Sequence, residues 1–93
     1  MNLRFSEHAQ WRLHLREINE KDVEMVLEKS IERYYDAVTR NQVAVAERIY
    51  KNKMRWLAVS YSEFLDEIWV VTAHPISRSQ IDNRSRMRRW IRL

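Results

Sequence analysis

The period of the hydrophobic pattern changes close to residue 31 of this chain. Up to that point apolar residues recur every three or four positions, which is the period of a helix packed on one side. Beyond it, apolar and polar residues alternate in segments rich in Val, Ile, Tyr, Trp and Thr, as in half-buried strands. These segments are residues 31–39, 43–51, 55–62 and 67–74. The pattern therefore predicts N-terminal helices followed by an antiparallel meander.

Capping residues indicate where the N-terminal elements begin and end. Residues 3–5 form a short predicted strand, and Ser6 is the expected N-cap of a helix that continues to about Arg16. Asn19 is followed three residues later by Asp22, an approximate capping box that predicts the start of a second helix. The residues of the first helix expected to face the core are Ala9, Leu13 and one of Trp11 or Leu15.

The C-terminal segment has the pattern of a basic helix. Pro75 ends the last predicted strand, and Ser79 with Asp82 predicts the helix N-terminus. The apolar residues that could dock this helix on the sheet are Ile81, Met87, Trp90 and Ile91. The chain has no glycine, so its turns need other residues at positive φ, and Asn41 and Asn52 are the best suited.

Together these elements predict an α+β fold in a single domain over residues 1–93. Two N-terminal helices pack on a twisted four- to five-stranded antiparallel sheet, and the basic helix follows at the C-terminus. A chain of this length can bury about two-thirds of its unfolded surface, which is enough for one core. The residues expected in that core are Phe5, Leu13, Val26, Leu27, Val45, Ile49, Leu57, Val59, Val70 and Val71.

The absence of two residue types excludes several classes of protein. Without cysteine the chain has neither a disulfide framework nor a thiolate zinc site. Without glycine it has no glycine-rich phosphate loop and no dinucleotide fingerprint, so we expect no cofactor. His8 and His14 would lie about 240° apart around a helix and could not chelate one ion, so we expect no metal site.

Short apolar runs argue against a membrane. Arg4 and Glu7 come too early for the apolar core of a signal peptide, and the longest apolar run, residues 68–73, is far shorter than a membrane span. We therefore expect a cytoplasmic protein with no membrane partner.

Positive charge is concentrated at the C-terminus. Residues 77–93 hold six Arg and one Asp, a net charge of +5, whereas the other 76 residues carry −1 of the total of +4. Such a patch can attract nucleic-acid phosphates or an acidic protein, and a solvated helix face explains it equally well. The candidate nucleic-acid-binding residues are Arg48, Arg78, Arg84, Arg88 and Arg89. For Arg48, a cross-strand pair with a carboxylate is an equal explanation.

A stripe on the first helix suggests phosphate chemistry. His8, Arg12 and Arg16 recur every fourth residue, which places them one above another on one helix face. The stripe thus combines a proton-transfer group with two fixed positive charges. The alternative is a solvated face on which the Arg side chains pair with Glu17 or Glu20.

Two motifs carry a resemblance to a known family. One is F-S-x-H-A-x-x-R-L-x-x-R-x-I, which runs from Phe5 to Ile18, and the other is V-V-T-A-x-P, from Val70 to Pro75. With the order of elements, they resemble an uncharacterised domain-of-unknown-function family grouped with the RelE/ParE-like toxins and with metal-independent ribonucleases such as barnase. The resemblance covers nearly the whole chain. It implies a RelE-like domain and the toxin of a toxin-antitoxin pair.

The resemblance also implies metal-independent RNA cleavage. This reaction needs a base for the ribose 2′-hydroxyl, cations for the phosphorane-like transition state, and an acid for the leaving 5′-oxygen. His8 is the candidate base, and Arg12 and Arg16 are the candidate cations. The candidate acids or substrate clamps are His74, Tyr61 and Arg78. For His74, a purely structural role at the end of a strand is the alternative.

The implied partners are RNA, either free or bound to the ribosome, and a cognate acidic antitoxin protein that covers the basic face. A homodimer is also compatible with the sequence. The alternative function is a noncatalytic module that keeps the RelE fold to bind nucleic acid or a partner protein, since a fold does not guarantee an activity.

Overall fold

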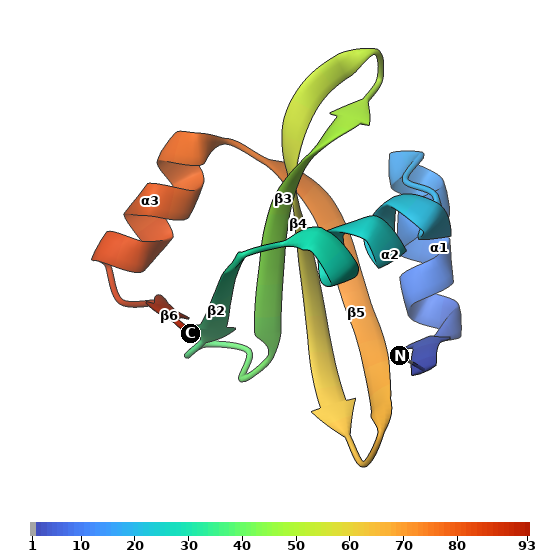
Figure 1. Ribbon diagram of the computed structural model, residues 1–93, viewed down its shortest axis with the longest axis horizontal. Helices are drawn as coiled ribbons and strands as arrows, with labels where there is room; N and C mark the ends of the chain where they lie inside the picture. The colour runs from blue at the N-terminus through green and yellow to red at the C-terminus, as the bar shows by residue number, and fades with distance from the viewer. Residues whose placement is uncertain (1) are drawn as a thin grey trace.

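The computed structural model describes residues 2–93, which form three helices and a six-stranded mixed sheet (Figure 1). In chain order the elements are β1 (Asn2–Phe5), α1 (Glu7–Arg16), α2 (Glu20–Lys29), β2 (Glu32–Asp36), β3 (Gln42–Tyr50), β4 (Lys53–Phe64), β5 (Glu67–Ile76), α3 (Arg78–Arg86) and β6 (Trp90–Arg92). The predicted α+β class is confirmed, and the meander begins where the hydrophobic period changes.

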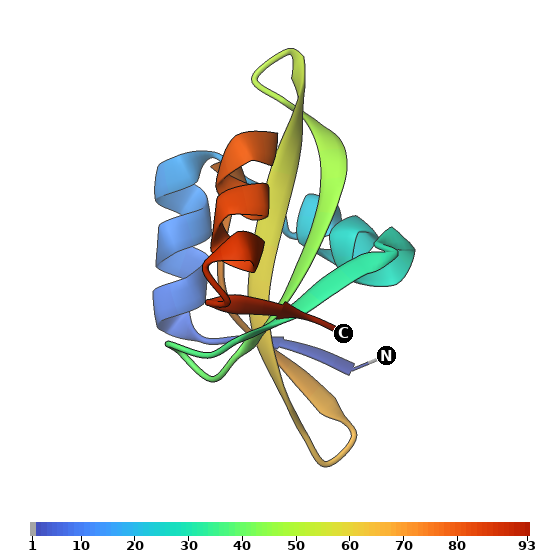
Figure 2. The same cartoon turned by 90° about the vertical axis from the view of Figure 1, so that its left-hand side faces the viewer.

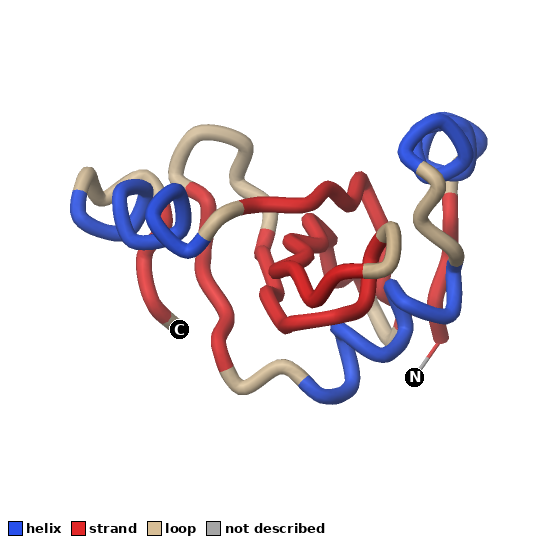
Figure 3. Tube along the Cα trace, turned by 90° about the horizontal axis from the view of Figure 1, so that it is seen from above, coloured by secondary structure: helices blue, strands red, loops and turns tan. Residues whose placement is uncertain are grey.

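The order of strands across the sheet is β1-β5-β4-β3-β2-β6. Strands β2 to β5 are antiparallel neighbours, and β1 pairs in parallel with residues 67–70 of β5. No described strand pairs with the rest of the outer edge of β5. α1 lies along this edge, where its Leu13 packs into the same core as α2, whereas α3 packs on the other side of the sheet from α2 (Figures 2 and 3). α1 therefore covers the edge of β5, while α2 and α3 cover opposite faces of the sheet.

Each side of the sheet has its own core. The α2 side buries Val23, Val26 and Leu27 of the helix with Leu57, Val59 and Val70 of the sheet. The α3 side buries Ile81 and Trp90 with Tyr34, Val43 and Val45. Because each large apolar side chain contributes roughly 1.5–3 kcal/mol when fully buried, these two clusters fix α2 and α3 on opposite sides.

The sheet differs from the predicted one in having a sixth strand and a parallel pair. The sixth strand, β6, lies in a segment that we predicted to be helical. α3 ends at Arg86, and Arg88, with φ 61°, turns the chain back so that residues 90–92 pair with β2. The buried Trp90 Nε1 donates a hydrogen bond to Asp36 Oδ2 at 3.2 Å. This contact is tertiary and leaves no local sequence pattern.

Helix α3 begins two residues earlier than predicted. Ser77, rather than Ser79, is the N-cap, because its Oγ accepts a hydrogen bond from the Gln80 backbone N–H at 3.1 Å. Gln80 Oε1 in turn accepts from the Ser77 backbone N–H at 3.0 Å, which completes a capping box.

Some residues predicted to be buried are exposed. Ile49 is 67% exposed, because the β3–β4 hairpin extends beyond the helices at one end of the sheet (Figure 1). Trp11 and Leu15 are 58% and 60% exposed, so neither faces the core. The other departures are Met87 and Ile91, which are exposed, and Phe5 and Val71, which are half-buried.

The turns of this glycine-free chain place several residues at positive φ. The predicted use of Asn is confirmed at Asn52 but is wrong at Asn41, where the preceding Arg40 has a φ of 66°. Asp36 determines the conformation of this turn, because its Oδ1 accepts hydrogen bonds from the backbone N–H groups of Val38 at 2.9 Å and Thr39 at 3.2 Å.

Candidate functional site

The stripe on α1 begins with a confirmed helix cap. Ser6 Oγ accepts a hydrogen bond from the Ala9 backbone N–H at 3.0 Å, as expected of an N-cap. His8 is exposed in the first turn, and its ring stacks on Trp11 with the ring centroids 6.0 Å apart. His8 and Arg16 share a helix face but lie about 12 Å apart along the axis, at 1.5 Å per residue.

Arg16 binds the outer edge of β5 rather than a carboxylate. Its Nη1 donates hydrogen bonds to Thr72 Oγ1 at 2.7 Å and to the Ala73 carbonyl at 3.1 Å. A strand carbonyl at a sheet edge needs such a donor, since β1 pairs only with the first residues of β5. Tyr50 Oη donates to the Arg16 carbonyl at 2.6 Å. The alternative pairing of the stripe with Glu17 or Glu20 therefore does not occur at Arg16.

His74 lies on the same face of β5 as Thr72, opposite Ala58 of β4. The side chain is half-buried. Burial, followed by the positive charges of Arg84, Arg16 and Arg89, lowers the pKa of His74 from 6.5 to about 4. The imidazole is therefore neutral at neutral pH and can accept a proton.

Two arginines on the α3 side of the sheet lie close enough to His74 to affect its charge. Arg84 lies on α3, with its guanidinium carbon 5.0 Å from the centroid of the Trp90 ring. Arg89 follows the helix, and its Nε is 3.5 Å from Oδ1 of the buried Asp36. Burial and then the nearby Arg89 lower the pKa of Arg84 from its ordinary value. We call the set formed by His74, Arg16, Arg84 and Arg89 the His74 cluster.

The His74 cluster carries unbalanced positive charge. Within residues 2–93, neither Arg16 nor Arg84 has a carboxylate at ion-pair distance, and only Arg89 pairs with one. An anion placed among these cations would relieve their mutual repulsion and would raise the pKa of His74. The arrangement therefore suits a phosphate group next to a proton acceptor.

Arg48, a predicted phosphate contact, has a structural partner instead. Its Nε and Nη2 donate to Asp22 Oδ1 of α2 at 3.1 and 3.0 Å, and both side chains are partly buried. This pair joins β3 to α2 on the side of the sheet opposite α3. The alternative that we gave for Arg48, a cross-strand pair with a carboxylate, is right about the carboxylate but wrong about its position, because Asp22 lies on α2 and not on a neighbouring strand.

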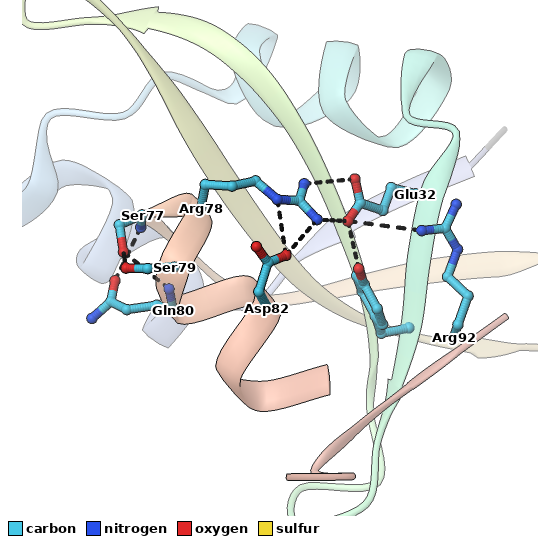
Figure 4. Close-up of polar contacts among 8 residues, drawn as sticks. Glu32, Ser77, Arg78, Ser79, Gln80, Asp82 and Arg92 are labelled. Carbon is cyan, nitrogen blue, oxygen red and sulfur yellow. Dashed lines mark hydrogen bonds and ion pairs between the residues drawn. The ribbon is translucent and has the colours of Figure 1, made fainter. Parts of the chain in front are cut away.

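Arg78 is also occupied by carboxylates (Figure 4). It donates to both carboxylate oxygens of Glu32 at 2.9 and 2.8 Å, and to Asp82 Oδ1 at 2.8 and 3.0 Å. The hydrogen bonds that Arg78 donates to these two carboxylates raise its pKa above its ordinary range. Arg92 approaches Glu32 as well, with Nη1 3.8 Å from Oε1. This network fastens α3 to β2, and its charges are largely neutralised.

The remaining candidates do not join the His74 cluster. Arg12 is half-buried between His8 and Arg16 on α1, and Arg88 is exposed beyond α3. Tyr61 belongs to the core on the α2 side, where its Oη accepts from Arg33 at 2.8 Å and donates to Gln42 at 3.0 Å. It is therefore not available as an acid at this site.

Two residues of the site escaped the sequence analysis. Thr72 orients Arg16, and its signal was its position in the V-V-T-A-x-P motif, two residues before His74. Asp36 holds Arg89 and Trp90, but a single acidic residue before a turn gives no indication of contacts more than fifty residues away.

Comparison with known proteins identifies a family but no function. Residues 5–75 match the family described as Domain of unknown function (DUF4258), and the chain therefore belongs to that family. The match includes Arg16, Thr72 and His74 and ends before α3, which carries Arg84. No curated protein and no solved structure shows significant similarity to the chain.

Residues 2–93 contain neither a membrane-spanning helix nor a cluster of metal ligands. No helix in this range has the length and apolar character needed to cross a membrane. No group of three or more His, Asp or Glu side chains in this range could hold a metal ion.

Proposed function

We propose that this protein is a metal-independent endoribonuclease of the RelE/ParE-like toxin type, which cleaves RNA by attack of the ribose 2′-hydroxyl. The observation that carries the proposal is the His74 cluster, in which a neutral imidazole lies close to Arg16 at the outer edge of β5 and to Arg84 and Arg89 from the α3 side. The same proposal includes a cognate acidic antitoxin protein, which would cover this positive surface and prevent RNA from entering.

The chemistry assigns each member of the cluster a role. The scissile phosphate binds Arg16, Arg84 and Arg89, and its negative charge raises the pKa of His74 toward the usual range for histidine. His74 then accepts the proton of the 2′-hydroxyl, and the 2′-oxygen attacks phosphorus. The arginines stabilise the charge that develops on the phosphoryl oxygens. The 5′-oxygen leaves with a proton from water, and a 2′,3′-cyclic phosphate remains.

This proposal moves the base from His8 to His74. His8 is solvent-exposed two helical turns from Arg16, whereas His74 is half-buried close to three positive charges. His8, stacked on Trp11, and Arg12 between the two sites would instead contact the RNA chain on one side of the scissile phosphate.

A noncatalytic module that binds nucleic acid or protein is the second candidate. One observation favours it: in the free protein, the low pKa of His74 makes the imidazole a weak base. The ribonuclease proposal requires that bound phosphate reverse this effect, and the binding module does not.

The test is a single-turnover cleavage assay on single-stranded RNA in the presence of EDTA, both with and without translating ribosomes. We expect His74→Gln to reduce the rate by about 10² to 10⁴, the usual contribution of a positioned base, with little change in RNA affinity. Lys29→Gln, which removes an exposed positive charge from α2 on the opposite side of the sheet, is the matched control and should cleave normally.

The products and the substrate analogue separate the mechanisms. We expect a 2′,3′-cyclic phosphate end and no cleavage when the nucleotide at the cut is 2′-deoxy. Cleavage of the deoxy substrate or a strict need for magnesium would contradict 2′-hydroxyl attack. RNA binding that depends on Arg84 and Arg89, with no cleavage under any of these conditions, would favour the binding module.

A further inference from the structure

We propose that a depression beside the His74 cluster binds the nucleobase adjoining the scissile phosphate. This base subsite rests on the proposed RNA-binding function. The depression has a volume of about 430 Å³, and its lining includes Trp56, Arg55, Ile76 and Gln80. Pockets that take small ligands usually measure about 300–1,000 Å³, so one base fits.

Strand register places this base subsite next to the His74 cluster. His74 pairs with Ala58, and two residues further along the same face Ile76 pairs with Trp56. Two residues of a strand span about 7 Å, which one nucleotide of an extended RNA chain can bridge. A phosphate bound beside His74 would therefore present a neighbouring base to Trp56.

The Trp56 ring is a rigid surface for stacking. It is half-buried, and the Arg78 guanidinium carbon lies 5.0 Å from its centroid. Glu32 and Asp82 hold Arg78 in place (Figure 4), so the guanidinium beside the ring supplies no free charge. Arg55 is exposed at the margin of the depression, where a backbone phosphate could pass.

Gln80 supplies a polar group of defined orientation. Its Oε1 is held by the Ser77 backbone N–H, so the capping box orients the amide. Its Nε2 donates no hydrogen bond to any residue between 2 and 93. The two N–H groups can therefore bind a carbonyl oxygen on a base edge, which uracil, guanine and cytosine possess and adenine lacks. The geometry thus disfavours adenine at this position.

The experiment measures the affinity of four-nucleotide RNAs made uncleavable by 2′-deoxy substitution, with an abasic site at each position in turn. In the unmodified protein one position should lose about 5- to 150-fold in affinity, the range for one stacked base. In Trp56→Leu that loss should disappear, while Trp56→Phe should retain most of it. Equal losses at all positions, or an unchanged loss in Trp56→Leu, would overturn the subsite.

Gln80→Glu is a second variant, and it changes an exposed side chain outside the core. Glu keeps the capping box but lacks the amide donors, so the melting temperature should hold while the preference for uracil over adenine disappears. A preference that survives this change would remove Gln80 from the subsite.

The two proposals can fail separately because binding is measured without cleavage. A position-specific loss of affinity, together with no cleavage of the corresponding all-ribose RNA, would overturn only the ribonuclease. Cleavage without any position-specific loss would overturn only the base subsite.

Discussion

The depressed pKa of His74 predicts a specific dependence of stability on pH. An unfolded chain protonates this histidine near pH 6.5, whereas the folded chain does so only near pH 4. The unfolded state therefore binds more protons between these values, and folding loses stability as the pH falls from about 6.5 to about 4. Above pH 6.5 the imidazole is neutral in both states, so it does not change the free energy of unfolding.

The size of this effect follows from the same two values. A fall in pKa from 6.5 to about 4 corresponds to roughly 3 kcal/mol at most, at about 1.4 kcal/mol for each tenfold change. Because the side chain is only half-buried, solvent screens the neighbouring charges, and we expect about 1–2 kcal/mol.

The measurement is urea unfolding of the unmodified protein and of His74→Gln at pH 7 and pH 4.5. Both proteins lose stability in acid as Asp36 and Glu32, whose pKa values are lowered by their hydrogen-bond partners, begin to take up protons. The loss should be about 1–2 kcal/mol smaller in His74→Gln, which has no imidazole to protonate. Equal losses in the two proteins would refute the argument.

Four further substitutions test three local features of the fold by urea unfolding. Tyr50→Phe should cost about 1 kcal/mol, because it removes the hydrogen bond to the Arg16 carbonyl at the end of α1; no loss would mean that solvent replaces it. Ser77→Ala should cost about 1 kcal/mol and Ser79→Ala much less, whereas the reverse order would contradict the observed helix start. Leu65→Asn should stabilise by about 0.5–1 kcal/mol, since Leu65 is exposed at φ 57° and Asn tolerates this conformation better; lower stability would show that the side chain has an unrecognised contact.

Local signals in the sequence predicted most of the elements. The caps at Ser6 and Asn19 were predicted because each depends on a hydrogen bond to a backbone group three residues away. The change from a helical to a two-residue period likewise predicted the meander. The side chains that face the core recur every three or four residues in a helix and every second residue in a strand. Such interactions are complete within one helix or one strand pair.

The candidate site was only partly predictable for the opposite reason. Sequence analysis selected Arg16, His74, Arg84 and Arg89, but it treated the first two as one group with His8 and the last two as one patch with Arg78. The assembly of the His74 cluster depends on α1 lying at the edge of β5 and α3 lying over the face of the sheet that carries His74.

What separates Arg84 from Arg78 is a long-range contact. Both are arginines on α3, and Asp82, four residues after Arg78, already pairs with Arg78 within the helix, but it is the contact from another element that completes the neutralisation. Glu32, on β2, neutralises Arg78 from 46 residues away, and no carboxylate among the described residues reaches Arg84. The sequence by itself determined the elements and the supply of positive charge. Only the tertiary structure decided which charges remain unpaired, because pairing depends on distances between elements that local patterns do not encode.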